Sequence, residues 1–456
     1  MAEVATTQAA PRGPGPKRSW FNVGVMALAH FMSDYYTAFL PVLLPLLSVR
    51  YDISYTQSAA IYMVFSVAMN FIQPPIGIMA DRRNLNFLMP LSVLTGGIFA
   101  SAVILSPNLF TLLGIVLLCG ICSSGFHPVS AGILTTVLPP RSKGFGTSIY
   151  IAGGNLGFAL APIIVAAVIE RWGENSLLAM ALPAVITTAL IYLRHLQAPS
   201  PRPSKSTSSE GAIPEVKLSE LICTKQFIVL NSSIALRSWS YCSLVTFIPL
   251  LFAAKGFSAM EGATSLVILL IGAVVGGLVG GALTDKFGPK KVTLGSFIVA
   301  LITGLIFLHY ADLSLISLGA LFLCGAGVYG STPNAIVWAQ RLMPGHAAFA
   351  ASMMLGFTFG AGYIESVLTG YLGDLIGLQA ALFYTVAVTM TLALILLALL
   401  KEPPKTDLSA HIAQAQEQLA ATQDPTGAAP STEPSTEPTA AHHAEHNAPA
   451  SSPAPK

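Results

Sequence analysis

The sequence predicts an all-α membrane protein of twelve transmembrane helices, arranged as two six-helix bundles. The composition is the first observation: 53% of the 456 residues are hydrophobic and only 10% are charged, whereas soluble domains carry about 25% charged residues. Long apolar runs are the second, because a helix needs roughly 20 mostly apolar residues to cross the hydrocarbon core. These runs lack the alternation with a period of two that membrane barrel strands show. Helices are therefore expected, since each satisfies its own backbone hydrogen bonds in lipid.

The apolar runs fall into two sets of six. The first set lies at roughly 22–47, 56–79, 86–105, 109–137, 145–169 and 176–193. The second set lies at roughly 226–253, 262–284, 291–310, 313–339, 347–372 and 379–400. The stretch that opens the first set is too long for the apolar core of a cleavable signal and carries His30 and Asp34, so we interpret it as the first span.

Composition divides the rest of the chain. We expect a cytoplasmic N-terminal segment at 1–20, an N-terminal bundle at 21–193, a Pro/Ser/Lys-rich cytoplasmic linker at 194–222 and a C-terminal bundle at 223–400. Residues 401–456 are rich in Ala, Pro, Thr and Glu, which predicts a disordered cytoplasmic tail. The tail histidines at 442, 443 and 446 are interpreted as part of this low-complexity segment and not as a metal site.

The placement of Lys and Arg predicts the orientation. With the N-terminus in the cytoplasm, the cytoplasmic loops, linker and termini hold 19 of the 23 Lys and Arg residues. The opposite loops hold three, Arg50, Arg171 and Lys255, and Arg237 alone falls inside a span. Positive charge is retained on the cytoplasmic side, so both termini are expected there.

The two halves repeat each other, which is the third observation behind the predicted fold. Corresponding positions at the ends of helices 2 and 8 are offset by 204 residues: Gly77, Asp81 and Arg82 recur as Gly281, Asp285 and Lys286. Further along, Pro128 and Pro139 recur as Pro333 and Pro344, at an offset of 205. Preserved offsets in turn residues predict two parallel copies of one six-helix unit.

The loop after helix 8 carries the most specific motif. G-G-A-L-T-D-K-F-G-P-K-K, residues 280–291, resembles the signature loop of major facilitator transporters, and G-I-M-A-D-R-R-N at 77–84 is a degraded copy. Glycine allows close helix approach, and an aspartate can accept hydrogen bonds from helix amides or a basic side chain. We therefore assign gating to Gly77, Asp81, Arg82, Gly281, Asp285 and Lys286. The alternative is an ordinary basic cytoplasmic loop.

A narrower resemblance covers nearly the whole membrane region. H-F-M-S-D-Y-Y at 30–36, Q-P-P-I-G at 73–77, S-S-G-F-H-P at 123–128 and G-G-N-L-G-F-A-L-A-P at 153–162 are similar to the fosmidomycin resistance family. So are A-Q-R-L-M-P-G at 339–345 and G-F-T-F-G at 356–360. The resemblance implies a drug exporter of the bacterial inner membrane, whose halves rock about a site between helices 1, 4, 7 and 10. Val129 and Arg341 stand where this family usually has Glu, which leaves the substrate and part of the coupling open.

Ionisable residues inside the spans are candidates for proton coupling, because such groups cost roughly 2.5–3.5 kcal/mol at mid-membrane. His30 and Asp34 lie one turn apart on helix 1, and helix 4 brings His127. A carboxyl group there can take up and release a proton that a histidine shares. Glu365 in helix 11 is a second candidate. A structural hydrogen-bond cluster, or for Glu365 a position at the membrane boundary, is the alternative.

Candidates for substrate binding are Arg237, Tyr35, Tyr36, Asn155 and Tyr241. Arg237 in helix 7 can pair with Asp34 or Glu365, or receive an anionic substrate by a forked contact; an arginine that snorkels from a helix end is the alternative. Tyr150, Trp239 and Phe357 are further candidates for the cavity wall, with core or lipid-facing packing as the alternative. The Gly-rich stretch around Asn155 either lets helices 5 and 8 slide between the halves or serves tight packing.

Nothing in the sequence predicts an enzyme, because it holds no phosphate-binding loop, nucleophile elbow or zinc-spaced His/Cys set. Cys119 and Cys122 are interpreted as packing thiols. We expect no cofactor, metal or nucleic-acid partner; the expected partners of a monomer are a small-molecule substrate, protons and the lipid bilayer. The predicted function is proton-coupled efflux of a small polar or anionic compound. Alternatives are proton-coupled uptake or exchange of an organic anion and, more remotely, a non-transporting membrane sensor or scaffold.

Overall fold

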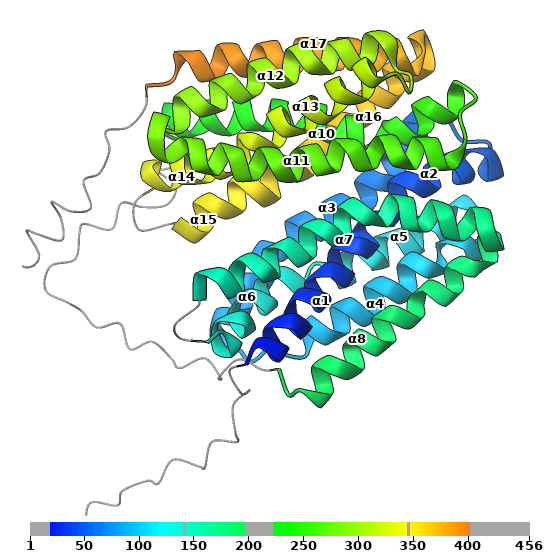
Figure 1. The fold of residues 1–456 in the computed structure, drawn as a ribbon, viewed down its shortest axis with the longest axis vertical. Helices are drawn as coiled ribbons and strands as arrows, with labels where there is room; N and C mark the ends of the chain where they lie inside the picture. The colour runs from blue at the N-terminus through cyan, green and yellow to red at the C-terminus, as the bar shows by residue number, and fades with distance from the viewer. Residues whose placement is uncertain (1–18, 140–142, 197–221, 344–346, 402–456) are drawn as a thin grey trace, which may run out of the picture. The chain divides into compact units, whose positions relative to one another are not determined.

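The computed structural model describes residues 19–139, 143–196, 222–343 and 347–401. Within these ranges every regular element is helical (Figure 1). The expected N-terminal segment and tail, and most of the expected linker, lie outside the described residues.

The first bundle contains the helices up to residue 193. They are α1 (Trp20–Thr37), α2 (Phe39–Tyr51), α3 (Tyr55–Arg82), α4 (Leu88–Ala102) with η1 (Val103–Leu105), α5 (Leu109–Ser123), α6 (Phe126–Val137), α7 (Lys143–Trp172), η3 (Glu174–Ala181) and α8 (Leu182–Leu193). Inside this bundle α1 packs on α7, α3 on α5 and α4 on both α5 and α8.

The second bundle contains the helices from residue 225 onward. They are α10 (Lys225–Ala254), α11 (Ala259–Phe287), α12 (Pro289–Tyr310), α13 (Leu315–Gly330), α14 (Thr332–Leu342), α15 (Ala347–Ser352), η4 (Met353–Phe357), α16 (Thr358–Ile376) and α17 (Leu378–Leu399). Here α11 packs on α13 and α10 on α16 and α17. Across the two bundles, α3 contacts α16, α7 contacts α11 and α2 contacts α10.

Polar caps mark where several spans begin. The side chains of Ser19, Asn108, Thr224 and Ser314 accept hydrogen bonds from the first-turn amides of α1, α5, α10 and α13. Reciprocal capping boxes open α3 with Ser54 and Gln57, and α11 with Ser258 and Glu261. These caps satisfy amides that have no partner inside the helix, so short loops are enough to separate long apolar spans.

Several spans are broken where the sequence analysis treated them as continuous. The first span breaks at Ala38, and the fourth breaks at Ser124 and Gly125, just before Pro128. In the second bundle, α13 and α14 break at Ser331, just before Pro333. Proline lacks the amide that would continue the helical hydrogen bonds, so the repeated prolines explain why the two breaks recur. The eleventh span contains the π-helical turn η4.

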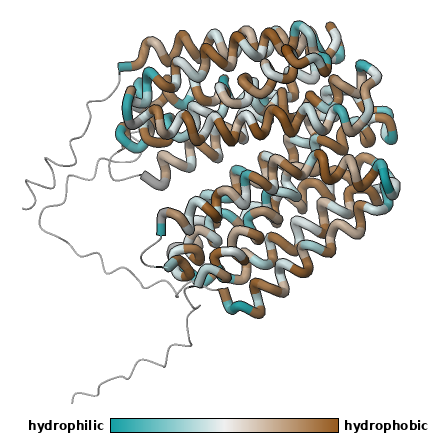
Figure 2. The backbone as a smooth tube through the Cα atoms, viewed as in Figure 1, coloured by the Kyte–Doolittle hydropathy of each residue, from teal (hydrophilic) through white to brown (hydrophobic). Residues whose placement is uncertain are grey.

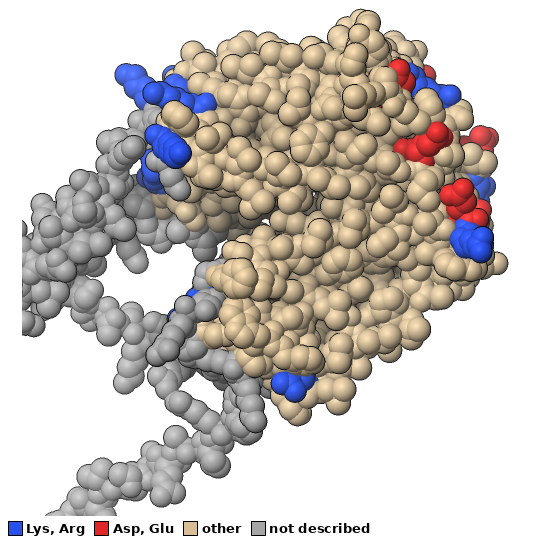
Figure 3. All heavy atoms as spheres, in the orientation of Figure 1, with Lys and Arg blue, Asp and Glu red and all other residues tan. Residues whose placement is uncertain are grey.

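The helices form a membrane domain. Among the described residues, eleven helical segments are long and apolar enough to cross a bilayer, and brown apolar residues dominate their length in Figure 2. One of the twelve expected spans is not among these eleven, namely the eleventh in chain order. Its main helix, α16, is less apolar because it carries several glycines, Glu365 and Asp374. Its contacts with α3 and α10 explain why such a span tolerates polar residues. On the face shown in Figure 3, charged side chains gather at the two ends, with an uncharged band between them.

The internal repeat predicted from residue offsets is present in the packing. A Cβ added to Gly77 would lie 3.7 Å from Cβ of Pro128, and one added to Gly281 would lie 4.0 Å from Cβ of Pro333. The same pairing of a gating-motif glycine with a proline thus occurs once in each half, which confirms the predicted arrangement of two related bundles.

Candidate transport site

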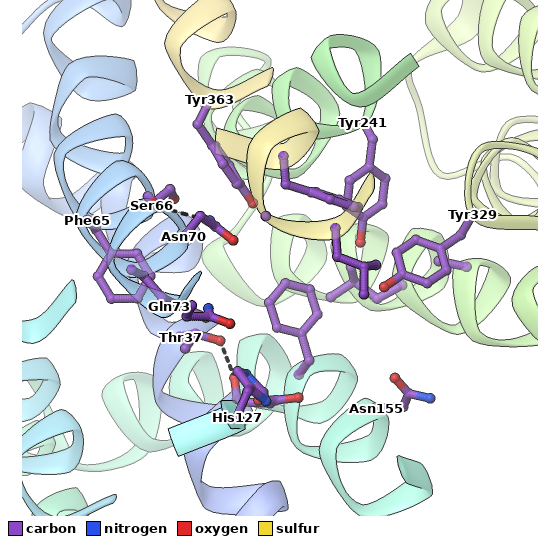
Figure 4. Close-up of a pocket in the computed structure, with 18 of the residues that line it drawn as sticks. Thr37, Phe65, Ser66, Asn70, Gln73, His127, Asn155, Tyr241, Tyr329 and Tyr363 are labelled. Atoms are coloured by element: carbon purple, nitrogen blue, oxygen red, sulfur yellow. Dashed lines mark hydrogen bonds and ion pairs between the residues drawn. The ribbon is translucent and has the colours of Figure 1, made fainter. Parts of the chain in front are cut away.

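A cavity of about 400 Å³ lies between the two bundles (Figure 4). The first bundle lines it from α1, α3, α6 and α7, and the second from α10, α11, α13, η4 and α16. Seven aromatic rings belong to its wall: Tyr62, Phe65, Phe158, Tyr241, Tyr329, Phe359 and Tyr363. The cavity can therefore surround a small molecule, with contacts from both halves.

One face of α3 contributes a polar stripe to this cavity. Ser66, Asn70 and Gln73 all line it, and their spacing of four and three residues places them on one side of the helix. The Asn70 side-chain amide donates to the Ser66 carbonyl oxygen at 2.8 Å. In Figure 4 the Asn70 and Gln73 side chains extend toward the space that Tyr241 and Tyr329 face from the other bundle.

Three ionisable side chains meet at the cavity wall. Asp34 lies between two histidines: its Oδ2 is 3.3 Å from Nε2 of His30, and its Oδ1 is 3.4 Å from Nε2 of His127. Asp34 and His127 line the cavity, and His30 lies behind them with 8% of its surface exposed. The structure therefore brings together the three first-bundle residues that the sequence analysis proposed for proton coupling.

The ring of His30 is held in one orientation. Its Nδ1 lies 2.8 Å from the carbonyl oxygen of Tyr150, and a carbonyl can only accept, so Nδ1 carries a hydrogen. The Nε2 atom is then left to face Asp34. The Tyr150 hydroxyl is in turn 2.7 Å from the Ser130 hydroxyl, and the two rings of His30 and Tyr150 stack at 4.2 Å.

Glycines of α7 make room for this arrangement. A Cβ on Gly154 would lie 2.4 Å from Nε2 of His30, so only glycine leaves space for the ring. A Cβ on Gly153 or Gly157 would lie 2.4 and 2.1 Å from the carbonyl oxygens of Ala27 and Phe31. The glycine-rich stretch therefore packs α7 tightly on α1. These glycines face α1 rather than α11, so their placement favours tight packing over sliding between the halves.

Arg237 is a fully buried cation in the second bundle. Twelve residues of α10 precede it (237 − 225), a rise of roughly 18 Å, so it does not snorkel from the helix end. Its exposure is 0%, and its Nε, Nη1 and Nη2 atoms have no hydrogen-bond partner. The guanidinium lies over the ring of Phe359, 5.2 Å from the centroid. Phe359 and Tyr241, one turn along α10, both line the cavity, so Arg237 lies directly behind its aromatic wall.

Comparison with known proteins gives the family. Residues 26–364 match the Major Facilitator Superfamily. The chain belongs to this superfamily. It is 27% identical to the fosmidomycin resistance protein of Escherichia coli over 381 residues, 82% of this chain and 89% of that protein. It is 22% identical over 309 residues to a gentisate transporter of Corynebacterium glutamicum, 66% and 68% of the two chains.

A solved structure supports the same fold. The chain superposes with a TM-score of 0.68 on a bacterial homolog of the human lysosomal transporter Spinster in an inward-facing, occupied conformation. The superposition covers 90% of this chain and 98% of that one, at 17% identity. The fold and the family resemblance inferred from the sequence are confirmed, and the major facilitator fold carries transporters, not enzymes.

In this major facilitator protein the predicted substrate residues separate into two groups. Asn155 and Tyr241 line the cavity. Tyr35 and Tyr36 are buried outside it, and the Tyr36 hydroxyl donates to the Met180 carbonyl oxygen at 2.8 Å. Of the further candidates, Trp239 donates to the Thr369 hydroxyl at 2.8 Å, and the ring of Phe357 is 6.1 Å from that of Phe71.

Glu365, and Gly77, Gly281 and Lys286 of the residues predicted to gate, are not among the residues that line the cavity. Glu365 is half-buried on α16, its Oε2 has no hydrogen-bond partner, and Arg237 pairs with neither Glu365 nor Asp34. Asp81, Arg82 and Asp285 fall in the last turns of α3 and α11, but their side chains lie outside the described part of the structure; Lys286 is exposed.

The sequence analysis missed most of the cavity wall. The sequence could have identified Ser66, Asn70 and Gln73, because polar residues spaced four and three apart form a visible polar stripe on an apolar helix. It could not have identified Tyr329 and Tyr363, because the sequence of an apolar span does not show whether an aromatic residue faces lipid or a cavity.

Proposed function

We propose that this major facilitator protein is a proton-coupled secondary transporter that exports a small polar or anionic compound by alternating access. The observation that carries the proposal is the cavity between the bundles with Asp34 and His127 in its wall. We place the protein in a bacterial inner membrane as a monomer with both termini in the cytoplasm, following the Lys and Arg distribution.

The geometry around Asp34 supports proton coupling. Because Nδ1 of His30 donates to a carbonyl, its Nε2 faces Oδ2 of Asp34 either with a second proton or with a lone pair. A lone pair facing a carboxylate repels it, whereas one proton on either atom makes the contact attractive. The pair of His30 and Asp34 is therefore more stable with a shared proton. Because Asp34 lines the cavity, this proton can exchange with the cavity.

The contacts between the bundles support an assignment of the conformational state. Asp374 of α16 accepts hydrogen bonds from the backbone amides of Tyr55 and Thr56 at the start of α3. Deeper along the same two helices, the Tyr363 hydroxyl donates to that of Tyr62 at 3.3 Å. Tyr55 and Asp374 lie at the helix ends away from the basic loops, so we infer that the outer side is closed and the cavity faces the cytoplasm.

The direction of transport rests on the family resemblance. The fosmidomycin resistance protein is named for resistance, which favours export; the gentisate transporter favours the alternative, proton-coupled uptake or exchange of an organic anion. Right-side-out and inverted vesicles with an imposed pH gradient distinguish the two. Export predicts accumulation in inverted vesicles with an acidic lumen; accumulation only in right-side-out vesicles under an inward proton gradient would show uptake.

The test of coupling is substrate-induced proton flux in proteoliposomes. Asp34→Asn keeps the shape but cannot release a proton, so it should abolish the flux while leaving passive substrate exchange. His127→Ala should weaken the flux less, because it tunes the acid rather than carrying the sole proton. Asp312→Asn is the matched control, since Asp312 lies in a surface turn bonded to Ser314. Normal substrate-induced proton flux in Asp34→Asn would contradict this assignment and make Glu365 the candidate proton site.

A further inference from the structure

Arg237 carries a buried positive charge that has no partner among the described residues, and this charge indicates what kind of substrate the protein binds. Its guanidinium is fully buried, and its three nitrogens have no hydrogen-bond partner. Removing such an ion from water is costly even after the protein relaxes. The cation–π contact with Phe359 offsets only part of that cost. The packing around Arg237 therefore does not compensate for the free-energy cost of burying its charge.

No carboxylate of the described residues forms an ion pair with Arg237. The two carboxylates named as possible partners, Asp34 and Glu365, do not pair with it: Asp34 is between His30 and His127, and Oε2 of Glu365 is itself without a partner. Tyr329, Cys242 and Tyr241 are near enough to interact electrostatically with Arg237, and none of them is a carboxylate. The missing negative charge must therefore come from outside the described protein.

The position of Arg237 indicates where that charge would arrive. Tyr241, Tyr329 and Phe359, which we call the aromatic screen, line the cavity from α10, α13 and α16. Their rings contact one another with centroid separations of 5.7 to 6.2 Å. Arg237 is stacked on the ring of Phe359, which lines the cavity, so a ligand that displaced this ring would lie next to the guanidinium.

We propose that Arg237 binds the oxyanion group of a small aromatic substrate whose flat body packs against the aromatic screen. This proposal rests on the proposed transport function and sharpens its substrate class. A planar guanidinium presents paired N–H donors that match a carboxylate or phosphonate. Seven aromatic rings in the wall of a cavity of about 400 Å³ suit a body of one ring.

The first test is binding to purified full-length protein in detergent, followed by calorimetric titration and thermal unfolding. The probes are benzoate and phenylphosphonate, with benzamide as the neutral control of the same shape. We expect the anions to bind at least tenfold more tightly than benzamide. Arg237→Gln should lower anion affinity at least tenfold and leave benzamide unchanged. Lys225→Gln, which removes an exposed cation from the first turn of the same helix, should leave both unchanged.

A second variant separates loss of binding from loss of fold. Arg237→Met replaces an uncompensated buried charge by an apolar chain, so the ligand-free protein should unfold at an equal or higher temperature. Benzoate should then give no further stabilisation. A large fall in the unfolding temperature would show that Arg237 has a structural partner and would overturn the proposal.

Three other results would also overturn it. The first is equal affinity for benzoate and benzamide, and the second is failure of both anions to bind. The third is a loss of anion affinity in Glu365→Gln as large as that in Arg237→Gln, which would indicate that Glu365 and Arg237 form an internal ion pair. All these measurements are made without a proton gradient. Anion binding with no substrate-induced proton flux would therefore count against the proposed coupling alone.

Discussion

Asp374 joins the two bundles at the end that we propose to be the outer one, and its removal should shift the protein toward an outward-open state. Its carboxylate accepts from the Tyr55 amide at 2.8 Å, the Thr56 amide at 3.0 Å and the Thr56 hydroxyl at 2.5 Å. These donors are at the start of α3, where unpaired amides and the helix dipole favour a negative charge. A carboxylate of one bundle thus caps a helix of the other.

The size of the shift follows from the bonds that Asp374→Asn would lose. An asparagine oxygen can still accept from one amide, but the charge and the second oxygen disappear. Hydrogen bonds to charged groups contribute about 1.5–3 kcal/mol each when buried, and this site is partly exposed to water, which reduces that value. A net loss of about 1–2 kcal/mol remains, which corresponds to roughly a 5–30-fold change in the ratio of closed to open states.

Distance measurements between spin labels at the outer ends test this shift. Labels at Val49 and Leu375, both exposed at that end, report the separation of the bundles. We expect Asp374→Asn to increase the population with the larger separation. The control Asp312→Asn lies in a turn of the second bundle and bonds to Ser314 within it, so it should leave the distribution unchanged. An unchanged distribution in Asp374→Asn would refute the assignment of this contact as a latch.

Three further predictions follow from the fold and the motifs. Asp285→Asn should slow transport with substrate affinity near normal, because the motif lies at the end of α11, far from the cavity; kinetics in vesicles check this, and a loss of affinity with normal turnover contradicts it. Deleting residues 405–456, which lie outside the described residues, should leave insertion and transport intact, as uptake assays would show. Gly157→Ala places a Cβ 2.1 Å from the Phe31 carbonyl oxygen and should destabilise the protein by at least about 1–3 kcal/mol. Gly132→Ala, where nothing lies within 4 Å, should show no such loss in thermal unfolding.

Much of the fold could be predicted because lipid restricts the structures that a chain can form. Apolar runs of span length must be helices, and the repeated Gly77 and Gly281 fixed the relation of the halves. The breaks at Ala38 and Ser331 were not predicted, because a break of one residue leaves the hydropathy of the span unchanged. The reduced hydropathy of α16 also shows that a span shielded by neighbouring helices need not look like a membrane span.

The cluster of His30, Asp34 and His127, which we propose for proton coupling, could also be predicted in part. Ionisable residues in a span are rare, so His30 and Asp34 stood out, and a spacing of four residues placed them together. Their contact with His127 depends on how α1 packs against α6, which no local pattern encodes. The support from Gly154 could not be anticipated either, since a glycine that makes room for a ring looks the same as one that packs against a backbone.

The two unusual charges occupy related places in the repeat. Subtracting the offset of 204 from Arg237 gives position 33, next to Asp34, so the cation and the acid are at nearly the same depth in the first helix of each half. Each of these helices also packs against a glycine of the fifth helix of its own bundle: Gly157 against Phe31, and Gly362 against Ser238. An anion that enters the cavity therefore meets attraction from one half and, whenever Asp34 is ionised, repulsion from the other.

Attraction by Arg237 and repulsion by ionised Asp34 would couple anion binding to protonation, and this coupling can be measured. An oxyanion bound at Arg237 favours a protonated Asp34, because like charges in a poorly solvated cavity repel. Asp34→Asn mimics the protonated state permanently. We therefore expect it to bind benzoate more tightly than the wild-type protein at an alkaline pH, at which the pair of His30 and Asp34 has lost its proton. The affinities for benzamide should be equal, since a neutral probe does not sense the charge. Titration calorimetry of the two proteins gives both values. Equal benzoate affinities of the wild-type protein and Asp34→Asn would mean that protonation of Asp34 does not affect anion binding. Coupling would then have to arise from the proposed gating contacts at the helix ends.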